Sequence, residues 1–302
     1  MIEKGTLWQT ITGKTANALK SGVLMPIPTD YEFVEDSGIR FIVRVVSGLA
    51  RKDEAREQQK GESPATGGKV DPFLSYEKDL FVTDISDTHS ALLNKFNVVE
   101  HHLLIVTRHF EEQEMLLTLK DLEALWTCMA EYEGLGFYNG GRGAGASQDH
   151  KHLQVVPLPL FPGDSGVPIN PLLEDVKIEG GMGIVPGFPF LHLFARLHRD
   201  LEQSPPQAAE KIFEVYREML KRLAIETPER KGPRRQSKPY CLLITNEWML
   251  LVPRSREFFN SISINSLGFA GALLVRNRDQ LDMLKKAGPM EVLKHVTLPL
   301  YP

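Results

Sequence analysis

Hydrophobic positions recur along the chain with two different spacings. Segments rich in β-branched and aromatic residues, bounded by polar turns, predict strands. These strand candidates are 39–46, 81–85, 89–96, 102–107, 152–156, 188–197, 240–245, 248–252 and 269–275. Two pairs of neighbouring candidates, 89–96 with 102–107 and 240–245 with 248–252, are separated by short polar turns, which predicts antiparallel pairing.

Apolar residues at intervals of three and four predict helices. The helix candidates are 1–25, 118–132, 204–223, 278–286 and 289–295. The apolar face of the first would consist of Leu7, Ile11, Ala18 and Leu19. Thr118 and Asp121 have the spacing of a capping box at the start of the second. Because strands and helices follow one another without strict β-α-β alternation, the pattern favours the α+β class with an antiparallel sheet.

Three segments predict loops. Residues 51–72 carry charges, Gln, Gly and Pro with almost no apolar side chain, which predicts a mobile loop. Loops of this length are uncommon in compact domains and often cover active sites. Residues 157–187 hold many Pro and Gly and predict a long surface excursion, and the basic, Pro-containing residues 228–239 predict another loop.

Composition and charge exclude several classes of protein. The chain has 302 residues, 42% apolar and 25% charged, as in soluble globular proteins. A formal charge of -4 argues against a nucleic-acid coating protein, which needs a basic surface. Cys128 and Cys241 belong to no disulfide or zinc pattern, which indicates a reducing compartment. Since the N-terminus lacks a signal-peptide pattern and no apolar run could span a membrane, we expect a cytoplasmic protein.

Two glycine motifs are deceptive. Gly13-Lys14-Thr15 resembles the end of a phosphate-binding P-loop, but Trp8 stands where that motif needs glycine. An interruption of a helix is the better interpretation. The glycines at 141, 143 and 145 lack the spacing of a dinucleotide-binding fingerprint, and a strand rather than a helix is predicted to follow them.

The segment 134–156 is the most informative part of the chain. Its first twelve residues include six glycines, and glycine lets backbone N–H groups approach a phosphate closely. Asn139, Ser147 and Gln148 add polar side chains to the same stretch. We therefore expect a Gly-rich turn that holds an anion, followed directly by a strand.

That predicted strand carries a pair of histidines and a glutamine. His150, His152 and Gln154 stand at alternating positions, so they share one face. Lys151 lies on the opposite face and is interpreted as an edge lysine. A His-x-His pair by itself could hold a metal or occur by chance on a surface. With no cysteine nearby and an anion site directly upstream, catalysis is the better interpretation.

The chemistry follows from these side chains. A neutral imidazole can attack phosphorus and form a covalent phosphoramidate, which divides one displacement into two. Donors around it would stabilise charge on the phosphoryl oxygens. Gln154 can donate to such an oxygen but cannot act as a general base for water. The pattern therefore favours transfer to a second phosphate over hydrolysis.

The stretch N-G-G-x-x-x-G-A-S-Q-x-H-K-H-L-Q over 139–154 resembles the active-site motif of the diadenosine tetraphosphate phosphorylases. These enzymes, also called ATP adenylyltransferases, are a transferase branch of the histidine-triad superfamily. Residues 92–107 resemble the paired strands of the family, and 265–271 with 274–276 resemble its C-terminal nucleotide-contacting segment. The resemblance implies a histidine-triad-like antiparallel sheet flanked by helices. It also implies an N-terminal part over 1–165 and a C-terminal part over 186–302, joined in one compact unit.

The resemblance implies roles for individual residues. His152 would be the nucleophile that becomes adenylylated, Gln154 would hold an α-phosphate oxygen, and His150 would support the site. The residues expected to bind the substrate are Lys52, Asn94, Lys95, Asn139, Gly145, Ala146, Ser147, Gln148, Gln154, Asn265, Ser266, Leu267 and Arg276. Two positions depart from the family: Ala272 replaces Met, which could loosen base selectivity, and Arg276 replaces Lys, which changes the donor geometry.

Several polar residues have a structural interpretation. Asn94 and Lys95 could also be ordinary polar residues at a hairpin end, and Lys52 a solvated charge. The residues interpreted mainly as structural or solvated are His101, His102, His192, Arg234, Arg235 and Lys238.

The expected reaction is phosphorolysis of diadenosine tetraphosphate to ATP and ADP through an adenylyl-His152 intermediate. The resemblance also implies the reverse adenylyl transfer and a side exchange of sulfate with ADP. We expect a divalent cation, Mg²⁺, carried with the nucleotide and no metal site in the protein. The expected partners are dinucleoside polyphosphates, ATP, ADP and phosphate, without nucleic acid, membrane or an obligate protein.

Two alternatives remain open. One is a nucleotide-sugar transferase of the galactose-1-phosphate uridylyltransferase type, against which the Gly-Ala-Ser-Gln stretch and the lack of a Cys pair argue. The other is a sensor that binds dinucleoside polyphosphates without turnover. The intact His-x-His-x-Gln argues against a sensor, because a protein that only binds needs no nucleophile.

Overall fold

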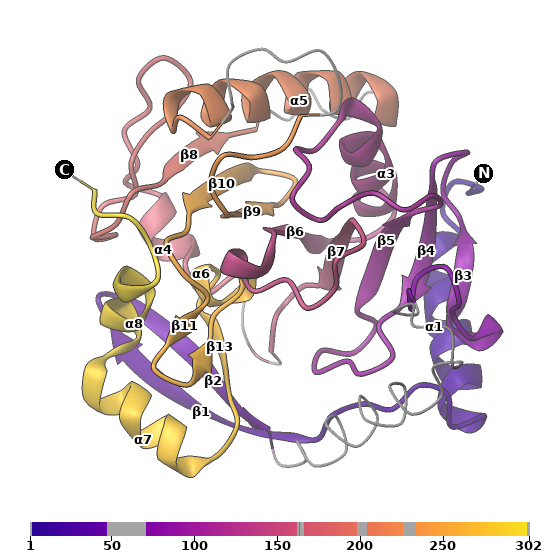
Figure 1. The fold of residues 1–302 in the computed structure, drawn as a ribbon, viewed down its shortest axis with the longest axis horizontal. Coiled ribbons are helices and arrows are strands. Elements are labelled where there is room, and N and C mark those ends of the chain that lie inside the picture. Colours follow the sequence, from indigo (N-terminus) through magenta and orange to yellow (C-terminus); the bar gives the residue numbers. More distant parts are fainter. Residues whose placement is uncertain are drawn as a thin grey trace, which may run out of the picture.

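The computed structural model describes residues 2–46, 71–161, 163, 166–197, 204–225 and 234–300. At its centre lies an antiparallel sheet. Its eight strands follow the order β3-β4-β5-β7-β6-β9-β10-β8. They are β3 (Phe81–Asp84), β4 (His89–Leu93), β5 (Leu103–Thr107), β6 (Gly134–Gly140), β7 (His152–Pro157), β8 (Leu193–Arg196), β9 (Tyr240–Ile244) and β10 (Trp248–Pro253). Because β6 pairs with β9, strands from both halves of the chain form one continuous sheet (Figure 1).

A smaller sheet of three strands lies beside the large one. It has the order β1 (Thr29–Asp36), β2 (Ile39–Val46), β13 (Ala272–Val275). The turn between β1 and β2 contains Ser37 and Gly38 with φ of 51° and 78°, and two-residue hairpin turns with positive φ match the natural twist of the strands. β13 joins β2 in parallel, so the C-terminal half of the chain completes this sheet too.

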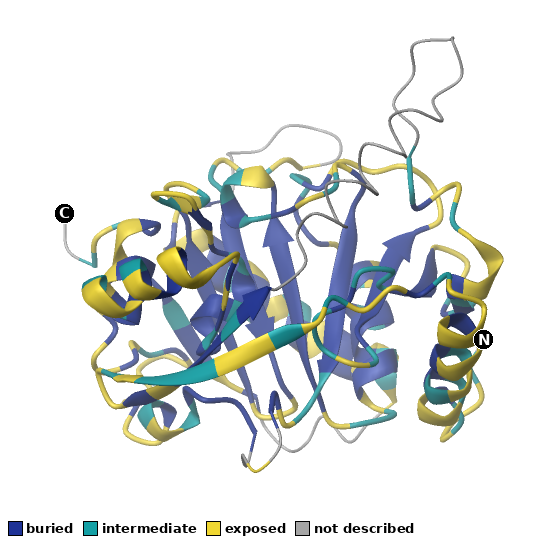
Figure 2. Cartoon of the chain, turned by 90° about the horizontal axis from the view of Figure 1, so that it is seen from below, coloured by how far each residue is buried: buried dark blue, intermediate teal, exposed yellow. Residues whose placement is uncertain are grey.

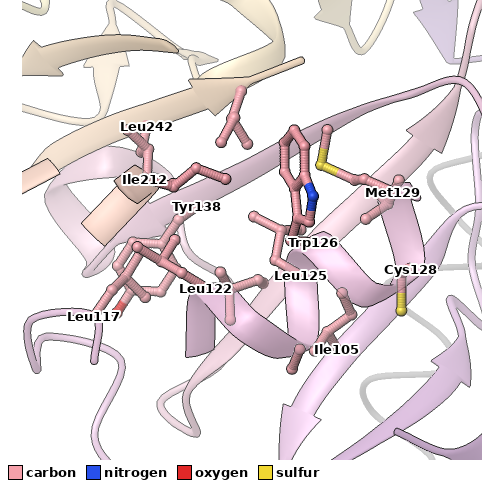
Figure 3. Close-up of a cluster of buried hydrophobic side chains, with 14 of the residues drawn as sticks. Ile105, Leu117, Leu122, Leu125, Trp126, Cys128, Met129, Tyr138, Ile212 and Leu242 are labelled. Carbon is pink, nitrogen blue, oxygen red and sulfur yellow. The ribbon is translucent and has the colours of Figure 1, made fainter. Parts of the chain in front are cut away.

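One face of the large sheet is covered by helices α1 (Leu7–Lys20), α3 (Leu119–Met129) and α5 (Pro205–Arg222). Figure 3 shows how α3 presents Leu122, Leu125 and Met129 to this cluster. The predicted capping box of α3 is present, since the side chains of Thr118 and Asp121 each accept a backbone N–H of the other residue.

The opposite face of the sheet is covered unevenly. Over β6, β9 and β10, a second hydrophobic cluster packs the small sheet and the helices α4 (Asn170–Leu173), α6 (Ser266–Phe269), α7 (Arg278–Ala287) and α8 (Pro289–His295). Over β4 and β5 lies a small cluster of Phe73, Leu92, Leu104 and Val106. Figure 2 shows the buried strands of the large sheet behind β1, whose residues are half-buried or exposed.

The remaining elements are short. The two-residue strands β11 (Phe258–Phe259) and β12 (Ile262–Ser263) form a separate hairpin, and η1 (Lys78–Leu80) and η2 (Arg142–Ala144) are single turns of 3₁₀ helix. No helix in the described ranges is long and apolar enough to cross a membrane.

Most predicted elements are confirmed, but the glycine-rich turn is in part wrong. Residues 134–140 form the fully buried strand β6. Glycine suits this strand because α3 packs closely on it: a Cβ at Gly136 would lie 2.7 Å from Met129 Sδ and 3.0 Å from Ile244 Cγ2. Of the six glycines in 134–145, only those at 141, 143 and 145 lie in the loop after β6, which includes the single turn η2. Gly13 lies within α1, which runs unbroken from Leu7 to Lys20, so the predicted interruption of a helix is wrong.

Other boundaries differ from prediction. β1 was not predicted, because none of its residues is fully buried and the hydrophobic signal is weak. Leu19 is 46% exposed and does not belong to the apolar face of α1. The strand predicted over 188–197 contains only Leu193–Arg196, and the residues before β13 form α6. Of the predicted loop 51–72, residues 51–70 lie outside the described residues.

Candidate active site

His152 begins β7 on the unevenly covered face of the sheet and is only 4% exposed. Its ring Nδ1 lies 2.8 Å from the backbone oxygen of His150. A carbonyl oxygen only accepts, so Nδ1 carries the proton and Nε2 keeps its lone pair. Within the described residues Nε2 has no hydrogen-bond partner. The ring is therefore held in the tautomer that a nucleophile at Nε2 needs.

The environment of His152 also keeps it neutral. Burial lowers the pKa of His152 to about 4, and the hydrogen bond to the His150 carbonyl, which raises it, does not compensate. The backbone N–H of His152 donates to Oε1 of Gln113 at 2.8 Å, and the Phe73 ring packs edge-on at 5.0 Å from the imidazole. At neutral pH the ring is therefore uncharged, with its one proton on Nδ1, and is rigidly held.

His150 lies behind His152. Its Nδ1 is 2.7 Å from Asp71 Oδ2, and its Nε2 is 2.8 Å from the backbone oxygen of Thr107. Phe73 and Phe110 pack against the ring at 5.7 and 5.4 Å. His150 thus reaches His152 through its backbone carbonyl rather than through its imidazole, and Asp71 and Thr107 fix the imidazole of the same residue.

Gln154 follows on the same face of β7. It pairs with Leu104 of β5 and Phe137 of β6, so it lies between the two hydrophobic clusters of this face. Its Oε1 is 3.0 Å from Nε2 of His102, and Nδ1 of His102 is 3.1 Å from Nδ2 of Asn94. His102 is thus buried and hydrogen-bonded at both ring nitrogens, as expected of a structural histidine, and its ring also contacts a predicted catalytic side chain.

The Gly-rich loop follows β6. Gly141 and Gly145 have φ of 81° and 89°, a conformation that favours glycine. The N–H groups of Gly145 and Ala146 bond to Arg142 O and Gly141 O at 2.9 and 3.2 Å. Both amides are thus used inside the loop.

The amides that follow them are different. Among the described residues, no partner is found for the N–H groups of Ser147 and Gln148, and Ser147 is exposed. These two amides could therefore donate to an anion. Gly145 and Ala146 shape the loop that presents them.

The segment 265–267 packs against this loop. A Cβ at Gly145 would lie 2.7 Å from the backbone oxygen of Ile264, so only glycine allows this approach. Asn139 Oδ1 accepts the N–H of Ser266 at 2.8 Å, and Ser266 Oγ donates to Tyr138 O at 3.0 Å. Asn265 caps α6 by accepting the N–H of Leu267 at 3.0 Å. The structure thus brings Asn139, the Gly-rich loop and 265–267 together, with Ser266 fully buried as the link.

The other predicted binding residues lie further out. Lys95 forms an ion pair with Glu77 at the end of β4. Arg276 is exposed at the end of β13, next to the end of β2. Ala272 is half-buried and begins β13. By the rise of a strand it lies about 13 Å from Arg276. Lys52 lies outside the described residues.

Lys151 is not an edge lysine. It is fully buried, with Nζ 2.7 Å from Asp121 Oδ2 and 3.1 Å from Glu111 Oε2. Asp121 Oδ1 also lies 2.9 Å from Nε2 of His89. Burial by itself raises the pKa of Asp121, but the hydrogen bonds and charges of His89 and Lys151 lower this pKa to about 2. This charged cluster ties β7 to α3 and β4 on the helix-covered side.

Asp71, Thr107 and Gln113 were not among the predicted site residues. Asp71 and Gln113 lie 79 and 39 positions from the histidines they contact, and no local motif marks them. His192 is structural as predicted: it accepts the Val185 N–H at 2.8 Å, and its Nδ1 lies 2.7 Å from Phe190 O. In the described part of the chain, no group of three or more His, Cys, Asp or Glu side chains could hold a metal ion.

Comparisons with known proteins agree with this geometry. Residues 1–175 match the family model of the Ap4A phosphorylase N-terminal domain, and residues 186–299 match that of the ATP adenylyltransferase C-terminal domain. The chain is 29% identical to diadenosine 5',5'''-P1,P4-tetraphosphate phosphorylase 2 of Saccharomyces cerevisiae, over 94% of this chain and 91% of that protein. It is 28% identical to protein APA1 of the same yeast, over 88% and 86% of the two chains.

Solved structures resemble the fold over its whole length. The crystal structure of yeast Ap4A phosphorylase Apa2 has a TM-score of 0.80 and 26% identity, covering 99% of this chain and 96% of that chain. The structure of the same yeast enzyme in complex with Ap4A has a TM-score of 0.79 and 25% identity, covering 99% of both chains.

Proposed function

Because the chain belongs to the Ap4A phosphorylase family of ATP adenylyltransferases, we propose that it cleaves diadenosine tetraphosphate with inorganic phosphate. The products are ATP and ADP, and the same site catalyses the reverse adenylyl transfer. The observation that carries the proposal is the state of His152: Nδ1 is bound to a carbonyl, burial keeps the ring neutral, and Nε2 is left with its lone pair.

We propose a covalent mechanism in two displacements. In the first, the Nε2 lone pair of His152 forms a bond to the α-phosphorus, and the bond from that phosphorus to the bridging oxygen breaks. ATP leaves with the electron pair. In the second, an oxygen of inorganic phosphate attacks the same phosphorus, the N–P bond breaks, and ADP leaves. The His150 carbonyl holds the Nδ1–H throughout and stabilises the positive charge that develops on the ring.

Donors around the phosphorus would stabilise the transition state. The amides of Ser147 and Gln148 and the side-chain N–H₂ of Gln154 are neutral donors, which suit developing charge on phosphoryl oxygens. Gln154 cannot take a proton from water, whereas inorganic phosphate brings its own anionic oxygen. This difference favours phosphate over water as the acceptor.

Further features belong to the same proposal. Mg²⁺ enters as part of the substrate, bridging phosphates of the nucleotide and neutralising their charge. Lys95 and Arg276 bind outer parts of the substrate. In a minor side reaction, sulfate exchanges with ADP. A cytoplasmic location is supported by Cys128 and Cys241, which are both free and buried.

A phosphate-dependence assay tests the proposal. The purified protein is incubated with diadenosine tetraphosphate and Mg²⁺, with and without phosphate, and the nucleotides are separated. ATP and ADP that appear only with phosphate would support phosphorolysis. ATP and AMP without phosphate would instead identify a hydrolase. No product in either reaction would favour the nucleotide-sugar branch or a sensor.

A further inference from the structure

A chain of three hydrogen bonds runs from the backbone into the candidate active site. It begins at the N–H of Phe96, which donates to Asn94 Oδ1 at 3.3 Å. Asn94 Nδ2 is 3.1 Å from His102 Nδ1, and His102 Nε2 is 3.0 Å from Gln154 Oε1. The end of this chain, the N–H₂ of Gln154, has no partner among the described residues.

The first link sets the direction of every other link. A backbone N–H can only donate, so the oxygen of the Asn94 amide faces Phe96 and its N–H₂ faces His102. Nδ1 of His102 must then accept, so the proton of the neutral ring is on Nε2. That Nε2–H donates to Oε1 of Gln154. The amide of Gln154 is thereby left with its two N–H donors directed away from His102.

The surroundings of His102 keep the ring in the neutral form that this direction requires. Its side chain is 8% exposed, and the ring of Phe137 packs 5.8 Å away. Burial lowers the pKa of His102 to about 4, and the hydrogen bond that His102 donates to Gln154, which raises the pKa, has the smaller effect. The backbone fixes the pair as well, because the Asn94 N–H donates to the His102 carbonyl at 2.9 Å.

We propose that His102 is a positioning residue that fixes the orientation of the Gln154 amide, so that this side chain presents N–H donors and not its oxygen to the phosphoryl group at His152. The proposal rests on the proposed function. An amide rotated by half a turn would place Oε1 against a phosphoryl oxygen, and two acceptors repel each other. In this scheme Asn94 supports the orientation of Gln154 and does not need to contact the nucleotide.

The first test is a double-mutant cycle measured by phosphorolysis. His102→Leu should lower kcat about tenfold with KM little changed, while Gln154→Ala should lower it about 100-fold, the cost of one lost donor. His102→Gln should retain activity within about threefold, because its amide can accept from Asn94 and donate to Gln154 in the same direction. In the Gln154→Ala background, His102→Leu should cause no further loss.

A structural role for His102 would give a different result. If His102 only supported the fold, His102→Leu would lower kcat by the same factor with or without Gln154. The matched control is His192→Leu, which removes another buried neutral histidine away from the site and should leave kcat within about twofold of wild type. An equal loss in both backgrounds would overturn the proposal.

The second test does not depend on turnover. In protein labelled with ¹⁵N histidine, long-range ¹H–¹⁵N spectra distinguish the two neutral tautomers of each ring. His102, assigned by its loss in His102→Gln, should show the Nε2–H tautomer at pH 7. The Nδ1–H tautomer would reverse the chain and refute the proposal. If the wild-type enzyme did not phosphorolyse diadenosine tetraphosphate, the proposed function would fail, and this spectrum would still decide the direction of the chain.

Discussion

At the scale of single residues, the site depends on which atom of each ring carries a proton. The carbonyl of His150 receives the Nδ1–H of His152 at 2.8 Å, while the ring of His150 is fixed between Asp71 and Thr107. The same arrangement occurs away from the site, where Nδ1 of His192 lies 2.7 Å from the Phe190 carbonyl. A held tautomer is therefore not sufficient for catalysis; an accessible phosphorus must also be presented to Nε2.

This comparison provides a controlled test of the nucleophile. His152→Ala should reduce phosphorolysis at least about 1,000-fold and abolish the adenylylated protein, because no other side chain replaces Nε2. The adenylyl group is detected by intact mass spectrometry after incubation with substrate and without phosphate. His192→Ala removes an equally buried ring and should keep both signals. Adenylylation of the His152→Ala protein would refute the assignment of the nucleophile.

At the scale of elements, the glycines of 134–145 divide into two groups with different tasks. In β6, Gly136 lets α3 approach the sheet, and in the following loop Gly141 and Gly145 turn the chain, with Gly145 also admitting the segment 265–267. Sequence alone predicts the chemistry of this stretch but not the division, because both groups have the same composition.

A pair of glycine substitutions distinguishes the effect of close packing on stability from the effect of helix propensity. Gly136→Ala should lower the free energy of unfolding by about 1–3 kcal/mol, since its Cβ would meet Met129 Sδ at 2.7 Å and Leu125 Cδ1 at 3.0 Å. Gly13→Ala in α1 meets nothing within 4 Å and should raise it by about 0.5–1 kcal/mol. Urea unfolding of the two variants measures both. A neutral effect of Gly136→Ala would contradict the packing account.

The extent of what sequence could predict follows from the range of each interaction. His150, His152 and Gln154 were recognisable because they stand at alternating positions in β7 and the two residues before it, and most strands and helices because their apolar periodicity is local. Asp71 and Gln113 could not be predicted, since their contacts with the histidines span 79 and 39 positions. The contact between His102 and Gln154 could not be predicted for the same reason, since it spans 52 positions.

At the scale of the whole molecule, Arg254 shows how the two halves form one site. Its side chain is 1% exposed and donates to the carbonyl oxygens of Ile264 at 3.0 Å and Val296 at 3.1 Å, with a longer contact of 3.4 Å to Ala144. One buried guanidinium thus joins the Gly-rich loop, the segment before α6 and the end of α8. Damage to this junction in the C-terminal half should therefore disturb the candidate site around His152, which lies in the N-terminal half.

Three buried neutral histidines also link the stability of the whole fold to pH. The pKa values of His102, His152 and His192 are each lowered to about 4, mainly by burial, whereas an unfolded histidine has a pKa of about 6.5. Between these values the unfolded chain binds more protons, so the stability contributed by the histidines is complete above pH 6.5 and is lost as the pH falls towards 4.

From pH 7.5 to 5, urea unfolding should show a loss in the free energy of unfolding on the order of 2 kcal/mol per histidine. His192→Leu should reduce that loss by about a third. Asp121, with a pKa of about 2, is ionised throughout this range, so an unchanged pH dependence in His192→Leu would contradict the assignment to histidines.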